Sequence, residues 1–133
     1  MPLTIQKQLS VFLENKPGVL QRLCESFAKQ KININALSVS DTVDHAVVRM
    51  IVSDPTKALH LLEEHGVLVV ETDVLALQMP DKPGALSQMA DKLSKAKVNI
   101  EYAYGTAGTG KGQKSLMIVR VSDLEKARKV LAK

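Results

Sequence analysis

Residues 15–20 read Asn15-Lys16-Pro17-Gly18-Val19-Leu20, and residues 81–86 repeat this stretch as Asp81-Lys82-Pro83-Gly84-Ala85-Leu86. The match extends beyond the repeated stretch, since Lys31-Ile32-Asn33-Ile34 aligns with Lys97-Val98-Asn99-Ile100 at the same offset. After a longer insertion in the second half, Ser53-Asp54 aligns with Ser122-Asp123. Self-similarity of this kind is the sequence signature of a repeated structural unit. We therefore predict two copies of one unit, with domains at residues 1–72 and 73–133.

The apolar periodicity predicts the elements of each copy. In the first copy, apolar residues alternate with polar ones from Ile5 to Leu13, which is typical of a half-buried strand. Pro17 and Gly18 then begin a helix with one apolar face. That face is predicted to cover the sheet through Leu20, Leu23 and Phe27, and its counterpart through Leu86, Met89 and Leu93.

Further elements complete a recognisable order. Strands are predicted near residues 34–39, 46–52 and 67–70, and a second helix begins at Pro55. The order βαββαβ gives an antiparallel sheet with both helices on one face. The fold class is therefore α+β, with two tandem ferredoxin-like βαββαβ units, of which the second lacks its last strand.

The missing strand predicts an association. The second copy reaches Lys133 directly after its second helix, so no later segment can pair with the apolar strand at residues 74–79. A strand with an unpaired edge is a ready site for pairing with another chain. We expect a homodimer or larger assembly that covers this edge; the alternative is that the chain is a shortened version of a longer protein.

Composition excludes several classes of protein. The chain is 45% hydrophobic and 24% charged, a balance typical of a soluble globular protein. Its longest apolar runs are too short for a membrane span, and its first residues do not resemble a secretory signal, so we expect a cytoplasmic protein without membrane contact. The single cysteine, Cys24, excludes an internal disulfide. The net charge of +4 comes from scattered lysines, which favour solvated faces over nucleic-acid binding.

No pattern of a catalytic site, metal site or cofactor site is complete. Residues 105–111 match the first seven positions of a phosphate-binding P-loop, but Gly112 replaces the magnesium-binding Ser or Thr. Residues 105–114 also lie between two predicted strands, so we expect a flexible hairpin loop; closure over a ligand or contact with a partner is the alternative role. His45, His60 and His65 lack the spacing of a helical metal site.

The repeated stretch resembles an ACT domain. The resemblance rests on residues 9–20 with the Asn-Ile strand start at residues 33–34, and on residues 79–86 with residues 98–102. It covers nearly the whole chain, which resembles stand-alone tandem ACT proteins. The resemblance implies a non-catalytic regulatory module that binds amino acids or similar small ligands, usually at interfaces between paired domains.

The candidate ligand site follows from the two turns. Backbone N–H groups at a helix start lack partners within the helix and suit a carboxylate. Side-chain oxygens of the turns and strand starts would accept hydrogen bonds from an ammonium group. The candidate ligand-binding residues are Asn15, Lys16, Pro17, Gly18, Val19, Leu20, Asn33 and Ile34 in the first copy, and Asp81, Lys82, Pro83, Gly84, Ala85, Leu86, Asn99 and Ile100 in the second.

Three functions remain open at this point. The first is an amino-acid sensor that changes its contact with a metabolic enzyme or regulator. Residues 9–20 also resemble the start of the small regulatory subunits of acetolactate synthase, so an obligate regulatory subunit of an amino-acid biosynthetic enzyme is the alternative. A module for nucleic acid or another acidic partner is motivated only by the lysine excess.

Overall fold

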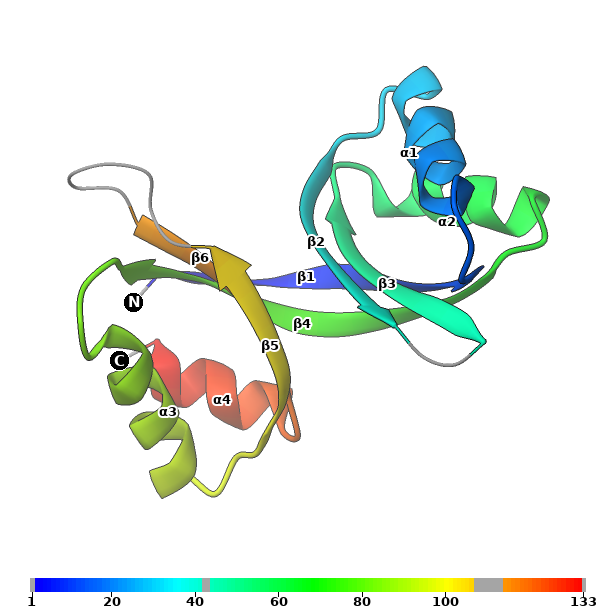
Figure 1. The fold of residues 1–133 in the computed structure, drawn as a ribbon. Helices are drawn as coiled ribbons and strands as arrows, with labels where there is room; N and C mark the ends of the chain where they lie inside the picture. Colours follow the sequence, from blue (N-terminus) through cyan, green and yellow to red (C-terminus); the bar gives the residue numbers. More distant parts are fainter. Residues whose placement is uncertain (1, 42–43, 107–113, 133) are drawn as a thin grey trace. The chain divides into compact units, whose positions relative to one another are not determined.

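The structure is a computed structural model that describes residues 2–41, 44–106 and 114–132 (Figure 1). Within these ranges the chain alternates strands and helices in the order that the repeat predicts. The elements are β1 Leu3–Glu14, α1 Val19–Lys29, β2 Ile34–Asp41, β3 His45–Val52, α2 Pro55–Glu64, β4 Leu68–Pro80, α3 Ala85–Lys95, β5 Ile100–Thr106, β6 Lys114–Val121 and α4 Leu124–Leu131. No helix in the described ranges has the length and apolar character needed to cross a lipid bilayer.

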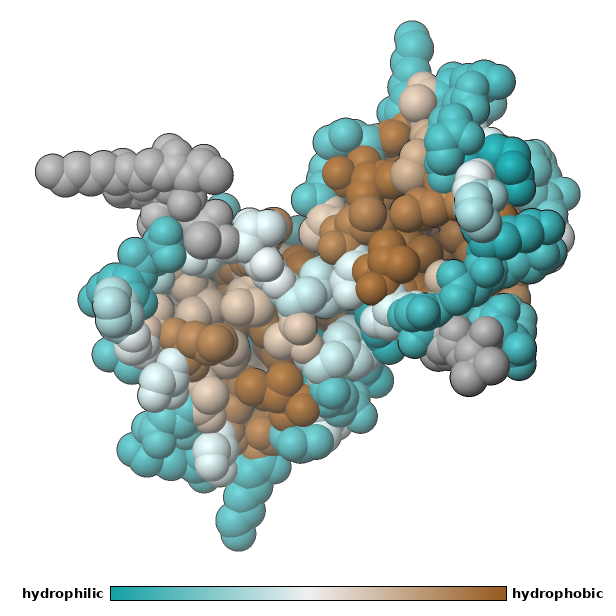
Figure 2. Space-filling view, in the orientation of Figure 1, coloured by the Kyte–Doolittle hydropathy of each residue, from teal (hydrophilic) through white to brown (hydrophobic). Residues whose placement is uncertain are grey.

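The chain divides into two compact units. Residues Lys7–Thr72 form one, here called the α1/α2 unit, and Asp73–Lys133 together with Met1–Gln6 form the other, the α3/α4 unit. The space-filling view shows hydrophobic residues gathered within each unit and hydrophilic residues around them (Figure 2). The predicted α+β class and the tandem ferredoxin-like arrangement are confirmed.

In the α1/α2 unit, β3 lies between β1 and β2 and is antiparallel to both, with Val48 opposite Val11 and also opposite Val39. Both helices cover one face of this sheet (Figure 1). The core between helices and sheet consists of apolar side chains from β1, β3, both helices and the segment before β2: Leu9, Val11, Leu13, Phe27, Ile32, Val48, Met50, Val52, Ala58 and Leu62.

In the α3/α4 unit, β6 lies between β4 and β5 and is antiparallel to both. Its core repeats the pattern of the first: Leu75, Leu77, Met79, Ala85, Met89, Leu93, Val98, Val119, Val121, Ala127 and Leu131. The second helix of each unit begins at an aspartate cap, since Asp54 accepts a hydrogen bond from the Lys57 N–H and Asp123 accepts one from the Lys126 N–H.

The predicted inner face of α1 is confirmed, but one residue of α3 was assigned wrongly. Met89 and Leu93 are buried as predicted, whereas the side chain of Leu86 is 53% exposed. The helix begins at Ala85, which is buried, and residues four apart share a helical face. Leu86 lies one position out of phase with Ala85, Met89 and Leu93, and therefore points to solvent.

The edge of the second copy is covered within the chain, so the prediction that residues 74–79 lack a partner was wrong. In the sheet, β4 lies between β6 and β1. The Gln78 N–H donates to the Pro2 carbonyl oxygen at 3.0 Å, and Leu3 packs against the core of the α3/α4 unit. The N-terminal residues of β1 thus supply the missing strand, which removes the edge argument for a homodimer.

Candidate functional site

The two turns that precede α1 and α3 have the same backbone conformation. Gly18 has φ 89° and ψ −13°, and Gly84 has φ 89° and ψ −12°. These positive φ values favour glycine, because other residues are strained there. Neither helix has a side-chain cap. The first N–H of each helix donates to a backbone carbonyl oxygen, Val19 to Lys16 at 3.5 Å and Ala85 to Lys82 at 3.3 Å, and the next N–H groups of the first turn have no capping side chain. Both turns therefore keep the backbone geometry that the repeated sequence predicts.

The first turn is occupied by its own polar side chains. Lys16 forms an ion pair with Glu14 at 3.0 Å, and the Asn15 amide donates to a carboxylate oxygen of Asp41. A Cβ at Gly18 would lie 3.2 Å from a guanidinium nitrogen of Arg22, so the Arg22 side chain covers the turn. The hydrogen bond and charge of Lys16 hold the pKa of the Glu14 carboxyl below its ordinary value, and the charges of Arg22 and His45 act in the same direction.

The second turn is open and has a cavity beside it. No heavy atom other than those of its chain neighbours lies within 4 Å of a Cβ built at Gly84. A cavity of about 270 Å³ adjoins this turn. Its lining carries two lysines and two glutamines and has no acidic side chain: Pro2, Gln78, Pro80, Lys82, Ala85, Gln88 and Lys92. This cavity can receive an anionic group near the start of α3.

The predicted asparagines lie at the other end of the sheet. The Asn33 N–H donates to the Ser53 hydroxyl and the Ser53 N–H returns a bond to the Asn33 carbonyl, both at 2.9 Å. In the register of β2 and β3, Ile34 pairs with Val52 whereas Asp41 pairs with Ala46. The eight residues of β2 span about 23 Å, and the turn after Glu14 lies at the Asp41 end. The structure therefore does not bring Asn33 to the turn at residues 15–18 of the same copy.

Asn99 occupies the equivalent position in the second copy. Its N–H donates to the Ser122 hydroxyl at 2.9 Å, and the Ser122 N–H donates back to the Asn99 carbonyl at 3.0 Å. Asn99 and Ile100 line a separate cavity of about 390 Å³ near the end of α3, together with Ala90, Leu93, Ser94, Lys97 and Val98. The sixteen candidate residues thus form separate groups within each copy rather than one site.

Sequence reasoning missed the side chains one turn into each helix. Arg22 and Gln88 follow Gly18 and Gly84 by four residues, and both line cavities. Helical side chains lean toward the N-terminus of their helix, so a residue at this spacing reaches back over the turn. The four-residue distance from each turn glycine was the sequence signal that could have identified these two side chains. It also shows that the two turns differ, because a guanidinium stands at the first and a neutral amide at the second.

The remaining candidates carry no reactive cluster. In the described part of the chain, no three His, Cys, Asp or Glu side chains come together as a metal site. The glycine-rich segment follows β5 and leads into β6, so it connects two strands rather than a strand and a helix. Residues 107–113, to which a closing or partner-binding role was assigned, lie outside the described residues.

Comparison with known proteins identifies the class. A family model described as an ACT domain pair matches residues 3–133. The chain therefore belongs to the ACT domain pair family. No curated protein matches the sequence significantly.

Among solved structures, the chain is similar to protein BT0572 from Bacteroides thetaiotaomicron, with 38% identity and a TM-score of 0.89 over 98% of this chain and 88% of that chain. It is also similar to the ligand-free regulatory subunit of aspartate kinase from Thermus thermophilus, with 15% identity and a TM-score of 0.68 over 99% and 94% of the two chains. The regulatory subunit of aspartate kinase from Thermus flavus shows 12% identity and a TM-score of 0.63 over 99% and 95%. At these lower identities the two aspartate kinase subunits share the fold alone.

Proposed function

We propose that the protein is a non-catalytic regulatory module that binds a free amino acid at the turn before α3. The observation that carries this proposal is the cavity beside Gly84, which joins an open helix start to two lysines. Membership of the ACT domain pair family supports the regulatory role. The first turn is the weaker candidate, because Arg22 covers Gly18 and the neighbouring polar side chains already bind one another.

The chemistry of the second turn suits both ends of an amino acid. The first N–H groups of α3 and the positive end of its dipole stabilise a carboxylate, and Lys82 adds positive charge beside them. The exposed carboxylate of Asp81 precedes the turn and would accept hydrogen bonds from the ligand's ammonium group. A cavity of about 270 Å³ lies below the range typical of drug-sized ligands, which agrees with a ligand as small as an amino acid.

Thermal unfolding of the full chain with each of the standard amino acids tests this function. A ligand at one hundred times its dissociation constant adds about 2.7 kcal/mol to the free energy of unfolding, which for a domain of this size raises Tm by several degrees. Lys82→Met is expected to weaken the shift, whereas the matched Lys16→Met at the first turn is expected to preserve it. The absence of a shift with every amino acid at millimolar concentration would contradict the proposal.

A regulatory module acts through a partner. We infer that the ligand changes how this protein contacts a metabolic enzyme. The alternative is a regulatory subunit held permanently by an amino-acid biosynthetic enzyme. The alternative is motivated by the resemblance of residues 9–20 to the start of the small regulatory subunits of acetolactate synthase, which makes that enzyme a candidate partner. Copurification with a large catalytic subunit supports the alternative, and ligand binding by the isolated chain supports the sensor.

A homodimer remains part of the proposal on different grounds. Strand β2 is a sheet edge, and two of its apolar side chains are exposed, Leu37 at 43% and Val39 at 51%. Edge strands with exposed apolar side chains pair readily with another chain. Light scattering is expected to give twice the chain mass of 14.5 kDa, and Val39→Lys is expected to reduce it to that of a monomer. A monomeric mass for the unmodified chain would contradict this part.

A further inference from the structure

A third cavity lies between the helices of the α1/α2 unit. It is a groove of about 340 Å³, and α1, α2 and the adjoining segments contribute its lining: Leu13, Val19, Arg22, Leu23, Ser26, Leu61, Leu62, His65 and Val67.

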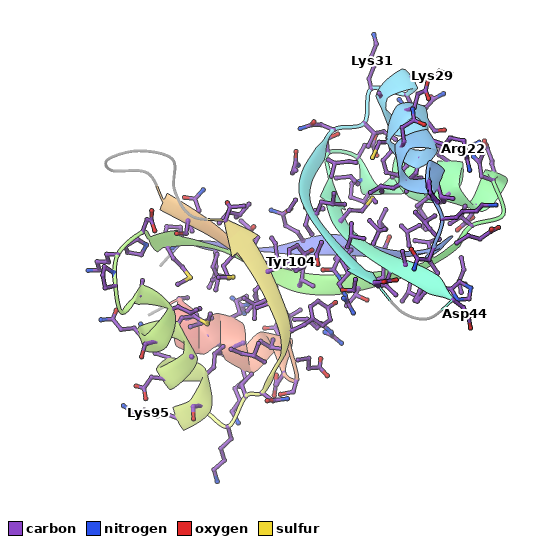
Figure 3. The ribbon with its side chains drawn as sticks, in the orientation of Figure 1. Arg22, Lys29, Lys31, Asp44, Lys95 and Tyr104 are labelled. Carbon is purple, nitrogen blue, oxygen red and sulfur yellow. The ribbon has the colours of Figure 1, made fainter. Side chains whose placement is uncertain are left out.

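The groove is apolar inside and cationic at its mouth. Arg22 lies on α1 beside α2 (Figure 3). Its guanidinium makes no hydrogen bond or ion pair with a described residue, and the carboxylate of Glu14, which its charge influences, is already paired with Lys16. The Nδ1 atom of His65 lies 2.8 Å from the Leu61 carbonyl oxygen, and Nε2 has no partner among the described residues. Because the Leu61 carbonyl oxygen accepts from Nδ1–H, Nε2 of the neutral imidazole is an acceptor, so the donor that the mouth offers to an anion is the Arg22 guanidinium.

The same groove is unsuited to an ammonium group. None of the residues that line it has a carboxylate, and the nearest charge is the positive guanidinium of Arg22. An amino acid with its side chain in the groove would place its ammonium beside a like charge without an acceptor, which costs free energy. A carboxylate with an apolar tail has no ammonium group and avoids this cost. Arg22 can bind the carboxylate through two parallel hydrogen bonds.

We propose that this groove binds a short aliphatic monocarboxylate. Its carboxylate contacts the Arg22 guanidinium, and its tail packs against Leu13, Leu23 and Leu62. The site goes beyond the proposed amino-acid site, which lies in the other unit, and does not depend on it. The second copy has no equivalent, because Gln88 stands where Arg22 is and Lys92 where Ser26 is. The protein would thus bind an aliphatic monocarboxylate and an amino acid at two separate sites.

Titration of the full chain with three compounds that share one tail tests the proposal. The probes are 4-methylpentanoate, leucine and 4-methylpentan-1-ol. Binding of each is measured by calorimetry and by the NMR methyl signals of Leu23, Leu62 and Val67. We expect 4-methylpentanoate to bind and shift these signals. The alcohol is expected to bind about tenfold more weakly or worse, because it loses the charge-assisted hydrogen bonds. Leucine is expected to leave these signals unchanged, even if it binds in the other unit.

Two variants identify the groove as the site. Arg22→Gln introduces the residue of the second copy and is expected to weaken 4-methylpentanoate about tenfold or more, whereas Arg22→Lys retains part of the affinity. Ser26→Leu fills the groove and is expected to abolish binding, while Lys29→Leu on the outer face of α1 preserves it. No binding at millimolar concentration, equal shifts with leucine, or an unchanged Kd in both Arg22→Gln and Ser26→Leu would overturn the proposal.

Discussion

Removal of residues 1–6 is expected to destabilise the α3/α4 unit selectively. The deletion takes away Leu3 from the core of that unit, the first residues of β1, and the Pro2 carbonyl oxygen that accepts a hydrogen bond from the Gln78 N–H. Each lost backbone hydrogen bond costs roughly 0.5–1.5 kcal/mol, and the exposed edge of β4 becomes a site for association. Hydrogen exchange is expected to accelerate in residues 73–80 and 114–121 far more than in residues 45–52, and light scattering is expected to show larger species.

A point substitution separates this effect from a general loss of stability. Leu3→Asp is expected to reproduce most of the loss, because it places a charge against an apolar core. Thr4→Ala, on an exposed residue of the same strand, is expected to be nearly silent. If the deletion leaves the exchange of residues 73–80 unchanged, the N-terminal segment does not complete the second copy.

Phe27→Ala is expected to lower the free energy of unfolding by roughly 3–5 kcal/mol. The Phe27 side chain is fully buried and packs in the core that contains Leu9, Met50 and Leu62. Its truncation leaves a cavity that the rigid sheet cannot fill. Urea denaturation measures the loss, and Tm is expected to fall by roughly 10 °C or more.

Lys29→Ala provides the matched control, since Lys29 is an exposed residue of the same helix. Its effect is expected to stay within about 0.5 kcal/mol. In the second copy, Leu93→Ala is expected to cost roughly 2–5 kcal/mol, because Leu93 is 1% exposed and occupies the position that aligns with Phe27. Equal losses from Phe27→Ala and Lys29→Ala would contradict the assigned faces of α1.

Most of the fold could be predicted because its signals are local and occur twice. Alternation identified the first strand, and the spacing of Phe27 and Leu23 identified the inner face of α1. The start of α3 was less certain, since one residue decides whether Ala85 or Leu86 faces the core, and an alanine carries a weak apolar signal. The first strand was predicted to begin at Ile5, but the pairing of its N-terminal end with the second copy was missed, because so short a segment gives no signal of its partner. Its partner, β4, is distant in sequence.

The candidate site was only partly predictable. The glycine turns were identified correctly as backbone features, because a positive φ at Gly18 and Gly84 has a direct sequence signal. Asn33 was grouped with the first turn without regard to the directions of the strands that carry them. Strands β1 and β2 are both antiparallel to β3, so they run in the same direction, and the start of β2 lies far from the end of β1. Arg22 and Gln88 were missed because their role depends on side-chain direction.

Amino-acid titration of three full-length proteins tests the central claim most directly. Calorimetry with the amino acid that gives the largest thermal shift compares the unmodified chain, Gly84→Val and Gly18→Val. Both variants place a β-branched residue at a positive φ and bear similar backbone strain, so each serves as the stability control for the other. If the ligand binds at the turn before α3, Gly84→Val weakens binding strongly and Gly18→Val changes it little. Equal affinity in all three proteins, or loss only in Gly18→Val, would contradict the account.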